Sequence, residues 1–154
     1  MRAGLAAFAV ILAATTAHAG ELRGRVVAVA DGDTLTILDA GRQQRRIRLA
    51  EIDAPEKRQP FGQRSKQSLS DLCYGRDAAI EDGGRDRYGR TIGPVSCAGI
   101  DANAEQVRRG MAWVFDRYAT DRSLYAIQDE ARAARRGLWS DPAPVPPWEY
   151  RAKR

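Results

Sequence analysis

The sequence predicts a mixed α+β fold that is mainly β, in the form of a five-stranded barrel with three packed helices. Two observations indicate this fold class. Short aliphatic runs alternate with polar residues and end at glycine, proline or aspartate, which is typical of strands. Three other segments repeat apolar residues at helical spacing. The segment from residue 20 to residue 141 is long enough for one domain with its own core.

Residues 1–19 are predicted to be an export signal. Arg2 provides the positive start, Leu5 to Ala14 form an apolar run, and Ala17-His18-Ala19 resembles a cleavage site. The run is shorter than the roughly 20 residues that span a bilayer, which disfavours a transmembrane anchor, and its terminal position disfavours a core helix. We therefore expect an exported monomer, periplasmic or secreted, with no stable membrane association after signal cleavage.

The predicted strands come early in the domain. The first three are joined by short connections, one of them the turn Asp39-Ala40-Gly41, so we expect an antiparallel meander. Two further strands follow a loop that Pro55, Pro60 and Gly62 interrupt. The five strands are predicted at residues 26–29, 34–38, 46–49, 78–81 and 91–97.

Three helices complete the predicted domain, which fits a barrel of the OB type. They are expected over residues 63–74, 102–109 and 124–138, with Asp101 opening the second and Gly137 ending the third. Residues 142–154 form a proline-rich tail that cannot continue a helix. Its Trp148-Glu149-Tyr150 segment either folds back onto the barrel or is disordered.

Composition excludes several kinds of catalysis. The formal net charge is +5, one unit of it from Arg2, which suits a polyanionic partner. The only histidine is His18, so the predicted mature chain has no histidine base, no Ser-His-Asp triad and no histidine-bound metal. Cys73 and Cys97 are the only cysteines, and in an exported chain we expect a disulfide between them, with two buried free thiols as the alternative.

Four short motifs carry acids and arginines suited to phosphodiester hydrolysis. Carboxylates are the oxygen ligands that hard cations such as calcium prefer, and an arginine can bind a phosphate through two parallel hydrogen bonds. Each motif alone is more often a turn or a solvated charge. Their order on a β-rich, histidine-free frame favours a shared site. The motifs are Asp31-Gly32-Asp33-Thr34, Arg48 to Asp53, Asp53-Ala54-Pro55-Glu56, and Asp86-Arg87-Tyr88-Gly89-Arg90.

This ordered set resembles the staphylococcal nuclease (thermonuclease) family, and the similarity extends from about Leu22 to Trp139. The resemblance implies an OB barrel with three helices. It also implies a calcium-dependent enzyme that cleaves DNA and RNA and leaves products ending in 3′-phosphate.

The resemblance assigns roles to individual residues. Asp33 and Asp53 match the calcium carboxylates, and Ala54 matches a position that offers its backbone carbonyl to the metal. Glu56 matches the acid proposed as general base toward the attacking water. Arg48 and Arg90 match the pair that binds the phosphate and stabilises the transition state.

The substrate-binding side of the resemblance is less complete. Arg87 and Tyr88 are candidates for contact with the nucleotide, although Tyr88 could instead pack beside Gly89. A second stacking tyrosine of the family falls on Asp116, and Tyr118 lies two residues later. Base preference therefore cannot be carried over from the family.

Two other functions remain as alternatives. A catalytically inactive nucleic-acid-binding OB module would be expected to lack at least one of the matched acids and arginines, and all are present. A small secreted structural domain leaves their order unexplained.

Overall fold

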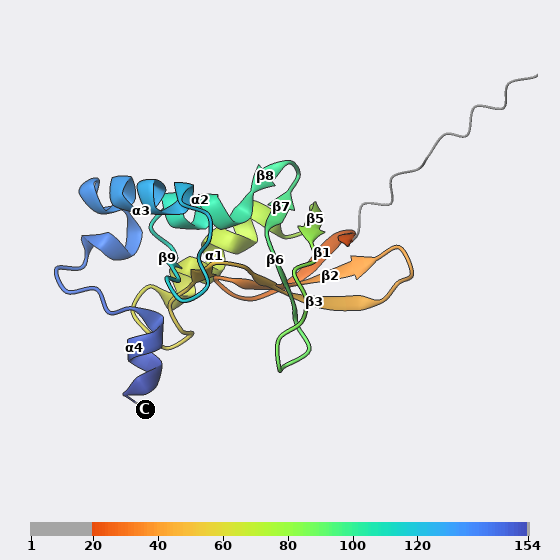
Figure 1. The fold of residues 1–154 in the computed structure, drawn as a ribbon, viewed down its shortest axis with the longest axis horizontal. Coiled ribbons are helices and arrows are strands. Elements are labelled where there is room, and N and C mark those ends of the chain that lie inside the picture. Colours follow the sequence, from red (N-terminus) through yellow and green to blue (C-terminus); the bar gives the residue numbers. More distant parts are fainter. Residues whose placement is uncertain (1–19, 154) are drawn as a thin grey trace, which may run out of the picture.

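The computed structural model describes residues 20–153, so the predicted signal, residues 1–19, lies outside the described residues. Figure 1 shows a twisted sheet with α1, α2 and α3 together on one side of it and α4 below. The strands are β1 (Glu21–Asp31), β2 (Thr34–Asp39), β3 (Gln44–Leu49), β4 (Ile52–Asp53), β5 (Asp77–Glu81), β6 (Thr91–Gly93), β7 (Val95–Cys97), β8 (Ile100–Asp101) and β9 (Trp113–Val114). The helices are α1 (Gly62–Cys73), α2 (Ala102–Arg108), α3 (Ser123–Ala133), the 3₁₀ helix η1 (Gly137–Ser140) and α4 (Pro147–Ala152).

The predicted fold class is confirmed, although the hydrogen-bonded sheet is open rather than closed. Its strand order is β6-β3-β2-β1-β5-β7-β8, with β6 and β8 at the edges, and β4 pairs separately with β9. The β3–β6 pair is parallel and the other pairs are antiparallel. Only Pro94 separates β6 from β7, so one extended segment borders β3 at one end and β5 at the other. The five predicted strands are all present, and the additional strands are two residues long.

Side chains alternate between the two faces of each strand, and those on the inner face form the core. Leu35 and Ile37 of β2 and Ile47 and Leu49 of β3 are fully buried. Burying one such side chain contributes roughly 1.5–3 kcal/mol to folding. In β1, the pairing with β2 shifts register between Val29 and Asp31, a bulge that bends the strand at the end where the candidate site lies.

The helices follow the predictions except at the end of the third. Asp101 caps α2 by accepting a hydrogen bond from the Ala104 N–H at 2.9 Å, as expected. The prediction that the last helix reaches residue 138 is wrong, because α3 ends at Ala133. The chain then turns through Arg135 and Gly137, both with positive φ, and Leu138 donates its N–H to the Gly110 carbonyl at 2.9 Å. Leu138 is buried as its spacing indicates, but within η1.

The predicted disulfide is present. Cys73 at the end of α1 and Cys97 at the end of β7 are bonded, and both are fully buried. The bond joins α1 to the sheet. Cys73 lies at the end of α1 opposite Gly62, which packs against the backbone of Glu56.

The proline-rich tail is structured, and a helix that the sequence did not predict ends it. Pro147 occupies the first turn of α4, where the missing N–H has no cost. Trp148 packs against a second core cluster, formed by Trp113, Ala131, Leu138 and Trp139. Of the two alternatives for Trp148-Glu149-Tyr150, the structure therefore has the segment folded back. Over residues 20–153, none of the helices has the length and apolar character to cross a membrane.

Candidate active site

The turn between β1 and β2 positions Asp33 at one end of the barrel. The side chain is only 6% exposed. Its Oδ1 accepts a hydrogen bond from the Thr34 hydroxyl at 3.0 Å, and its Oδ2 accepts one from the Ala54 N–H at 2.7 Å. Gly32 is required in this turn, because a Cβ there would lie 1.7 Å from the Ser65 Oγ of α1. The fit between turn and helix fixes the direction of Asp33.

Arg48, on β3, connects the two predicted calcium carboxylates. Its Nη1 lies 3.3 Å from Asp33 Oδ2, and its Nη2 lies 3.2 Å from Asp53 Oδ1. The same Nη1 donates to the backbone carbonyls of Leu49 and Ile52, each at 3.0 Å. The guanidinium is therefore held by both backbone and side-chain oxygens in a largely buried position.

A sharp turn between β3 and β4 keeps Arg48 and Asp53 adjacent. Glu51 adopts φ 64°, which is unfavourable for a residue with a Cβ. Its carboxylate accepts hydrogen bonds from the Thr120 N–H at 3.1 Å, the Thr120 hydroxyl and the Asp121 N–H at 3.2 Å. These contacts stabilise the turn and place Asp53, which is 1% exposed, beside Asp33.

Glu56 follows Asp53 in the loop that leads to α1. Its N–H donates to the Gln59 Oε1 at 3.0 Å, so the loop folds back on itself directly after Pro55. The carboxylate of Glu56 lies on the same side as that of Asp53, because one guanidinium contacts both of them. The structure thus brings together four predicted site residues, Asp33, Arg48, Asp53 and Glu56, with the Ala54 backbone between them.

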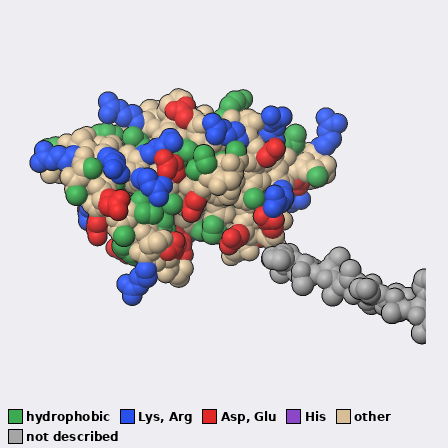
Figure 2. Space-filling view, turned by 90° about the horizontal axis from the view of Figure 1, so that it is seen from above, with side chains coloured by type: hydrophobic (Ala, Val, Ile, Leu, Met, Phe, Trp, Pro, Cys, Tyr) green, Lys and Arg blue, Asp and Glu red, His purple; other side chains and the backbone are tan. Residues whose placement is uncertain are grey.

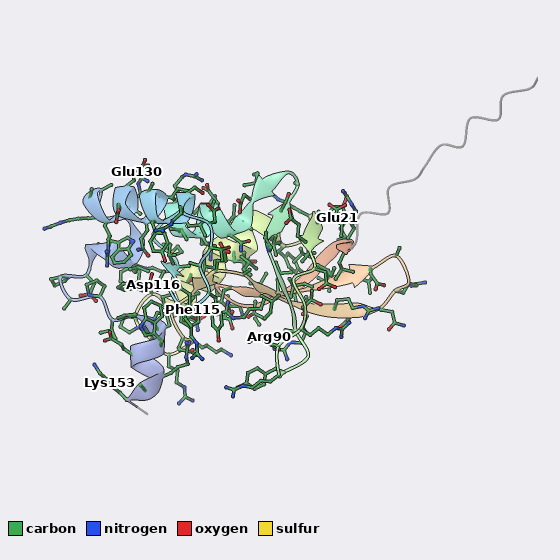
Figure 3. The ribbon with its side chains drawn as sticks, viewed as in Figure 1. Glu21, Arg90, Phe115, Asp116, Glu130 and Lys153 are labelled. Carbon is green, nitrogen blue, oxygen red and sulfur yellow. A yellow bond between two sulfur atoms is a disulfide. The ribbon has the colours of Figure 1, made fainter. Side chains whose placement is uncertain are left out.

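Arg90 reaches the site from the hairpin formed by residues 82–90. Asp86 organises this hairpin: its Oδ1 accepts from the N–H groups of Tyr88 and Arg90, and its Oδ2 accepts from the Arg90 Nε at 2.7 Å. The Nη1 of Arg90 also lies 3.3 Å from the Thr34 hydroxyl, which in turn donates to Asp33. Arg90 is therefore linked to the carboxylates through one hydroxyl group. Its position on the lower side of the molecule is visible in Figure 3.

The predicted substrate-binding residues are exposed and stand apart from the buried acids. Tyr88 is 65% exposed, with the guanidinium groups of Arg87 and Arg90 at 5.0 and 5.5 Å from its ring centre. Tyr118 is 58% exposed and contacts Phe115 edge to face at 5.1 Å. Asp116 accepts a hydrogen bond from the Tyr125 hydroxyl at 2.9 Å. Only Tyr88 has a contact with a residue that reaches the site.

One arginine at the site was not predicted from the sequence. Arg151, in α4, places its Nη2 2.7 Å from Asp53 Oδ2 and its Nη1 2.8 Å from Glu56 Oε1. The only signal in the sequence was the aromatic segment before it, Trp148-Glu149-Tyr150, which indicated that the tail could return to the barrel.

The site has an excess of negative charge at its centre. Burial, together with the charge of Asp33, raises the pKa of Asp31 from its usual value to about 6. Burial also raises the pKa of Asp53, against the hydrogen bond from Arg151. The hydrogen bonds that Arg151 donates to Asp53 and Glu56 raise the pKa of its guanidinium, which is therefore firmly charged. A cation at the carboxylates is therefore electrostatically favoured.

Buried amides, which the sequence analysis also missed, hold the surrounding loops. Gln106 donates to the carbonyls of Gly32 and Ser65 at 2.7 and 3.1 Å. Asn103 donates to the Ala50 carbonyl at 2.8 Å and accepts from the Val95 N–H at 2.9 Å. Both come from α2, so this helix supports the turns that carry Asp33 and Asp53.

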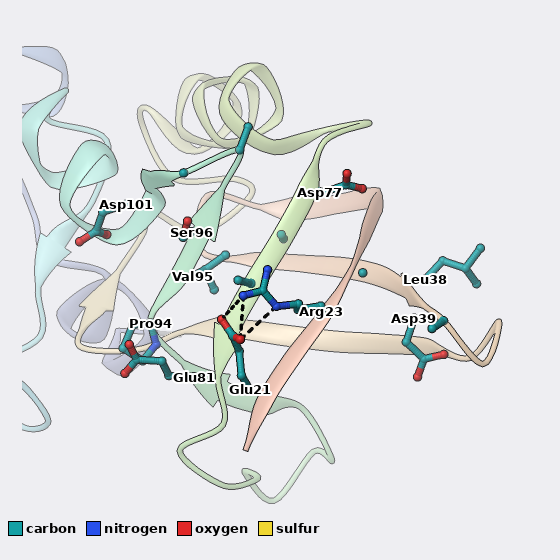
Figure 4. A pocket seen from close by; sticks show the side chains of 16 residues that line it. Glu21, Arg23, Leu38, Asp39, Asp77, Glu81, Pro94, Val95, Ser96 and Asp101 are labelled. Carbon is teal, nitrogen blue, oxygen red and sulfur yellow. Dashed lines mark hydrogen bonds and ion pairs between the residues drawn. The ribbon is translucent and has the colours of Figure 1, made fainter. Parts of the chain in front are cut away.

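One sizeable hollow in the described structure lies away from this site. It has a volume of about 840 Å³ and lies across β1, β5 and β7, where Figure 4 shows Arg23 paired with Glu21 among further acids. An acidic lining is unsuited to a polyanion. On the face drawn in Figure 2, basic side chains are spread over the surface with acidic ones between them, so this face carries no single basic groove.

Several known proteins are similar to this chain over most of its length. The model of the family described as staphylococcal nuclease homologue matches residues 46–141. An uncharacterised endonuclease of Escherichia coli O157:H7 is 46% identical over 135 residues, which is 87% of this chain and 88% of that protein. A micrococcal nuclease of Shigella flexneri is 41% identical over 98% of this chain and 95% of that protein. A probable staphylococcal-like nuclease of Oryza sativa subsp. japonica is 33% identical over 79% of this chain and 41% of that protein. The chain therefore belongs to the family of staphylococcal nuclease homologues.

Proposed function

We propose that the chain is a calcium-dependent nuclease that hydrolyses the phosphodiester bonds of DNA and RNA. As a member of its family the chain is a nuclease, that is, a hydrolase of phosphodiester bonds. The metal, the substrates and the residue roles are the proposal. The observation that carries it is the convergence of Asp33, Asp53 and Glu56 with Arg48 at one end of the barrel.

The donor set suits a calcium ion. Asp33 and Asp53 both lie within 3.3 Å of one guanidinium, so a single cation can contact both. Within residues 20–153 no group of three or more acids, cysteines or histidines is placed to hold a metal. Asp33 and Asp53 would supply two carboxylate ligands, and the Ala54 carbonyl and water would supply further oxygens. A bound calcium ion would supply positive charge beside the phosphate and lower the pKa of a bound water.

The two predicted arginines are suited to the phosphate. A phosphodiester repels an attacking hydroxide, and guanidinium groups offset this charge and the charge that develops in the transition state. Arg48 is fixed within the barrel, and Arg90 approaches from the hairpin beside Thr34. Tyr88, exposed and adjacent to Arg90, is in position to contact a nucleotide.

Glu56 is proposed as the general base. It would take a proton from water while the water oxygen bonds to phosphorus, and the bond to the 5′ oxygen would break as that oxygen takes a proton from solvent. Glu56 would then return its own proton to solvent. Its place one residue after Pro55 keeps it close to Asp53 while leaving it partly exposed to water. We further propose an exported monomer, periplasmic or secreted, with no stable membrane association.

The alternative, an inactive nucleic-acid-binding OB module, makes opposite predictions. The test is plasmid cleavage with calcium, with magnesium and with excess chelator, by the wild type, Glu56→Gln and the matched control Glu130→Gln on the exposed face of α3. We expect cleavage in calcium, less in magnesium because of its octahedral preference, and none in chelator. Glu56→Gln should lower kcat roughly 10²-fold or more without weakening DNA binding. Cleavage that persists in chelator would refute the calcium assignment, and binding without cleavage would favour the module.

A further inference from the structure

The C-terminal tail is anchored over the loop that carries Glu56. Gln59 donates to the Val145 carbonyl at 2.7 Å. Trp148 stacks on Phe115 with ring centres 5.2 Å apart and planes 7° from parallel. These contacts lie on either side of α4's start, so the helix is attached to the domain before it reaches the site. The tail lies beyond residue 141, where the match to the family ends.

This anchoring directs Arg151 onto Asp53, the proposed metal ligand, and Glu56, the proposed general base. Its guanidinium contacts both oxygens of Asp53, at 3.2 and 2.7 Å, and also Glu56 at 2.8 Å. Asp53 is almost fully buried, whereas the Arg151 side chain is 43% exposed. Arg151 is therefore the partner of this ion pair that can move into solvent, whereas Asp53 is enclosed by the domain.

A metal ion and this guanidinium have opposing requirements. The proposed calcium ion must bind Asp53, and the proposed attacking water must lie between that ion and Glu56. Arg151 connects the same two carboxylates, so its positive charge lies next to the position required by another cation. At contact distances two like charges repel strongly in a partly buried site.

We propose that Arg151 is a built-in competitor of the metal, a tethered cation that neutralises Asp53 and Glu56 and must leave Asp53 when calcium binds. This inference rests on the proposed calcium-dependent function of the site. Because the cation is attached to the chain, its effective concentration at Asp53 does not fall with dilution. The apparent calcium affinity equals the intrinsic affinity multiplied by the fraction of molecules in which Arg151 leaves the acids free.

The test is calcium titration by isothermal calorimetry of the purified protein and two variants. Arg151→Met removes the competing cation and keeps the apolar stem. Lys153→Met, at the exposed end of the same helix, removes the same charge without touching either acid, and Figure 3 shows it at the tip of α4. We expect Arg151→Met to bind calcium about tenfold more tightly, as for loss of a charge-assisted bidentate pair. Lys153→Met should differ from the wild type by less than about twofold.

A third variant, at Trp148, tests the anchoring without altering the acids or Arg151. Trp148→Ala removes the stacking on Phe115, and it should also raise calcium affinity, by less than Arg151→Met. Thermal unfolding supplies an independent readout. In chelator Arg151→Met should melt below the wild type, because the buried Asp53 loses one of its two arginine partners, and saturating calcium should reduce or remove this difference.

The outcomes separate this inference from the proposed function. If Arg151→Met and Lys153→Met bound calcium with equal affinity, the effect would come from the overall charge of the protein, and the proposed competition would be refuted. Weaker calcium binding by Arg151→Met would make Arg151 a support of the metal site and also overturn it. Either result leaves calcium dependence intact. If calcium produced no binding heat with any of the proteins, both the metal assignment and the competition would be refuted.

Discussion

Two parts of the candidate site differ in how they are held. The inner group, Asp33, Arg48 and Asp53, comes from the β1–β2 turn, β3 and β4 and is buried among backbone hydrogen bonds. The outer segments, the hairpin 82–90 and the tail 142–153, are exposed and bring Arg90 and Arg151 to the inner group through a few side-chain contacts. Both outer segments lie on the same side of the sheet in Figure 1.

This difference implies that removing a charged residue affects stability and activity differently in the two parts of the site. An inner residue cannot be removed without leaving a buried partner unpaired, so stability and activity depend on it together. The acid paired with Arg90 belongs to the same hairpin, and Asp53 keeps its contact with Arg48 when Arg151 is removed. Loss of an outer arginine should therefore cost less stability than loss of Arg48.

Arg48→Ala should have the largest effect, because it removes a partner from two buried carboxylates. We expect turnover to fall roughly 10²–10³-fold. The free energy of unfolding should also fall, by about 3 kcal/mol. Measurements of kcat and of urea unfolding on one preparation check both. Arg45→Ala, on the same strand and paired with Asp39 in a more exposed position, is the matched control and should change neither strongly. A stable, inactive Arg48→Ala would contradict the inner-group interpretation.

Arg90→Ala should reduce turnover by a similar factor with little loss of stability. Its strongest partner, Asp86, belongs to its own hairpin and is free to be solvated when Arg90 is lost. Turnover is expected to fall roughly 10²–10³-fold, and the free energy of unfolding should fall by less than about 1 kcal/mol. Arg85→Ala, in the same hairpin, serves as control. Normal turnover of Arg90→Ala would exclude this arginine from the site.

The double substitution of Cys73 and Cys97 by alanine should change stability alone. The disulfide closes a loop between residues 24 apart in sequence, behind the site. Its loss should lower the free energy of unfolding by roughly 2–4 kcal/mol. At temperatures well below melting, kcat should equal that of the wild type. Reduction of the wild type with dithiothreitol should reproduce the result, and a drop in kcat of the folded variant would show that the bond also shapes the inner group.

Asp31→Asn should change the pH dependence of stability. The raised pKa of Asp31 means that the folded state disfavours its ionised form. The stability linked to Asp31 is fully present below about pH 4 and is lost as pH rises through about 6. The variant should therefore be more stable than the wild type at pH 8, by on the order of 1 kcal/mol after allowance for partial exposure, and equal near pH 4.

Urea unfolding in chelator at pH 4 and pH 8 measures this difference. Asp39→Asn is the control with the opposite sign, because the Gln43 N–H and Arg45 lower the pKa of Asp39. If Asp31→Asn were less stable than the wild type at pH 8, the site would not have the excess negative charge inferred from its geometry.

Local patterns in the sequence were sufficient for the five main strands, for the first two helices, and for the motifs that hold the inner group, whose roles came from the family resemblance. These features depend on alternation, turn residues and motifs of four to six residues. Local patterns could not show that α3 stops at Ala133, since that depends on a close approach between Gly137 and Gly110. They also could not show that Arg151 returns to Asp53, which lies 98 residues earlier. Asp31 looked like any turn aspartate, because its burial arises only when the barrel is assembled.

The distances in sequence between contacting residues have a consequence for folding. The Ala54 N–H bonds to Asp33 across 21 residues, and Arg90 contacts Thr34 across 56. Closing loops of this length costs chain entropy before the contacts form, so the site is expected to assemble late, together with the parallel β3–β6 pair. Catalytic activity should then appear during refolding only with the slowest structural phase, and fragments that lack either end of these contacts should be inactive.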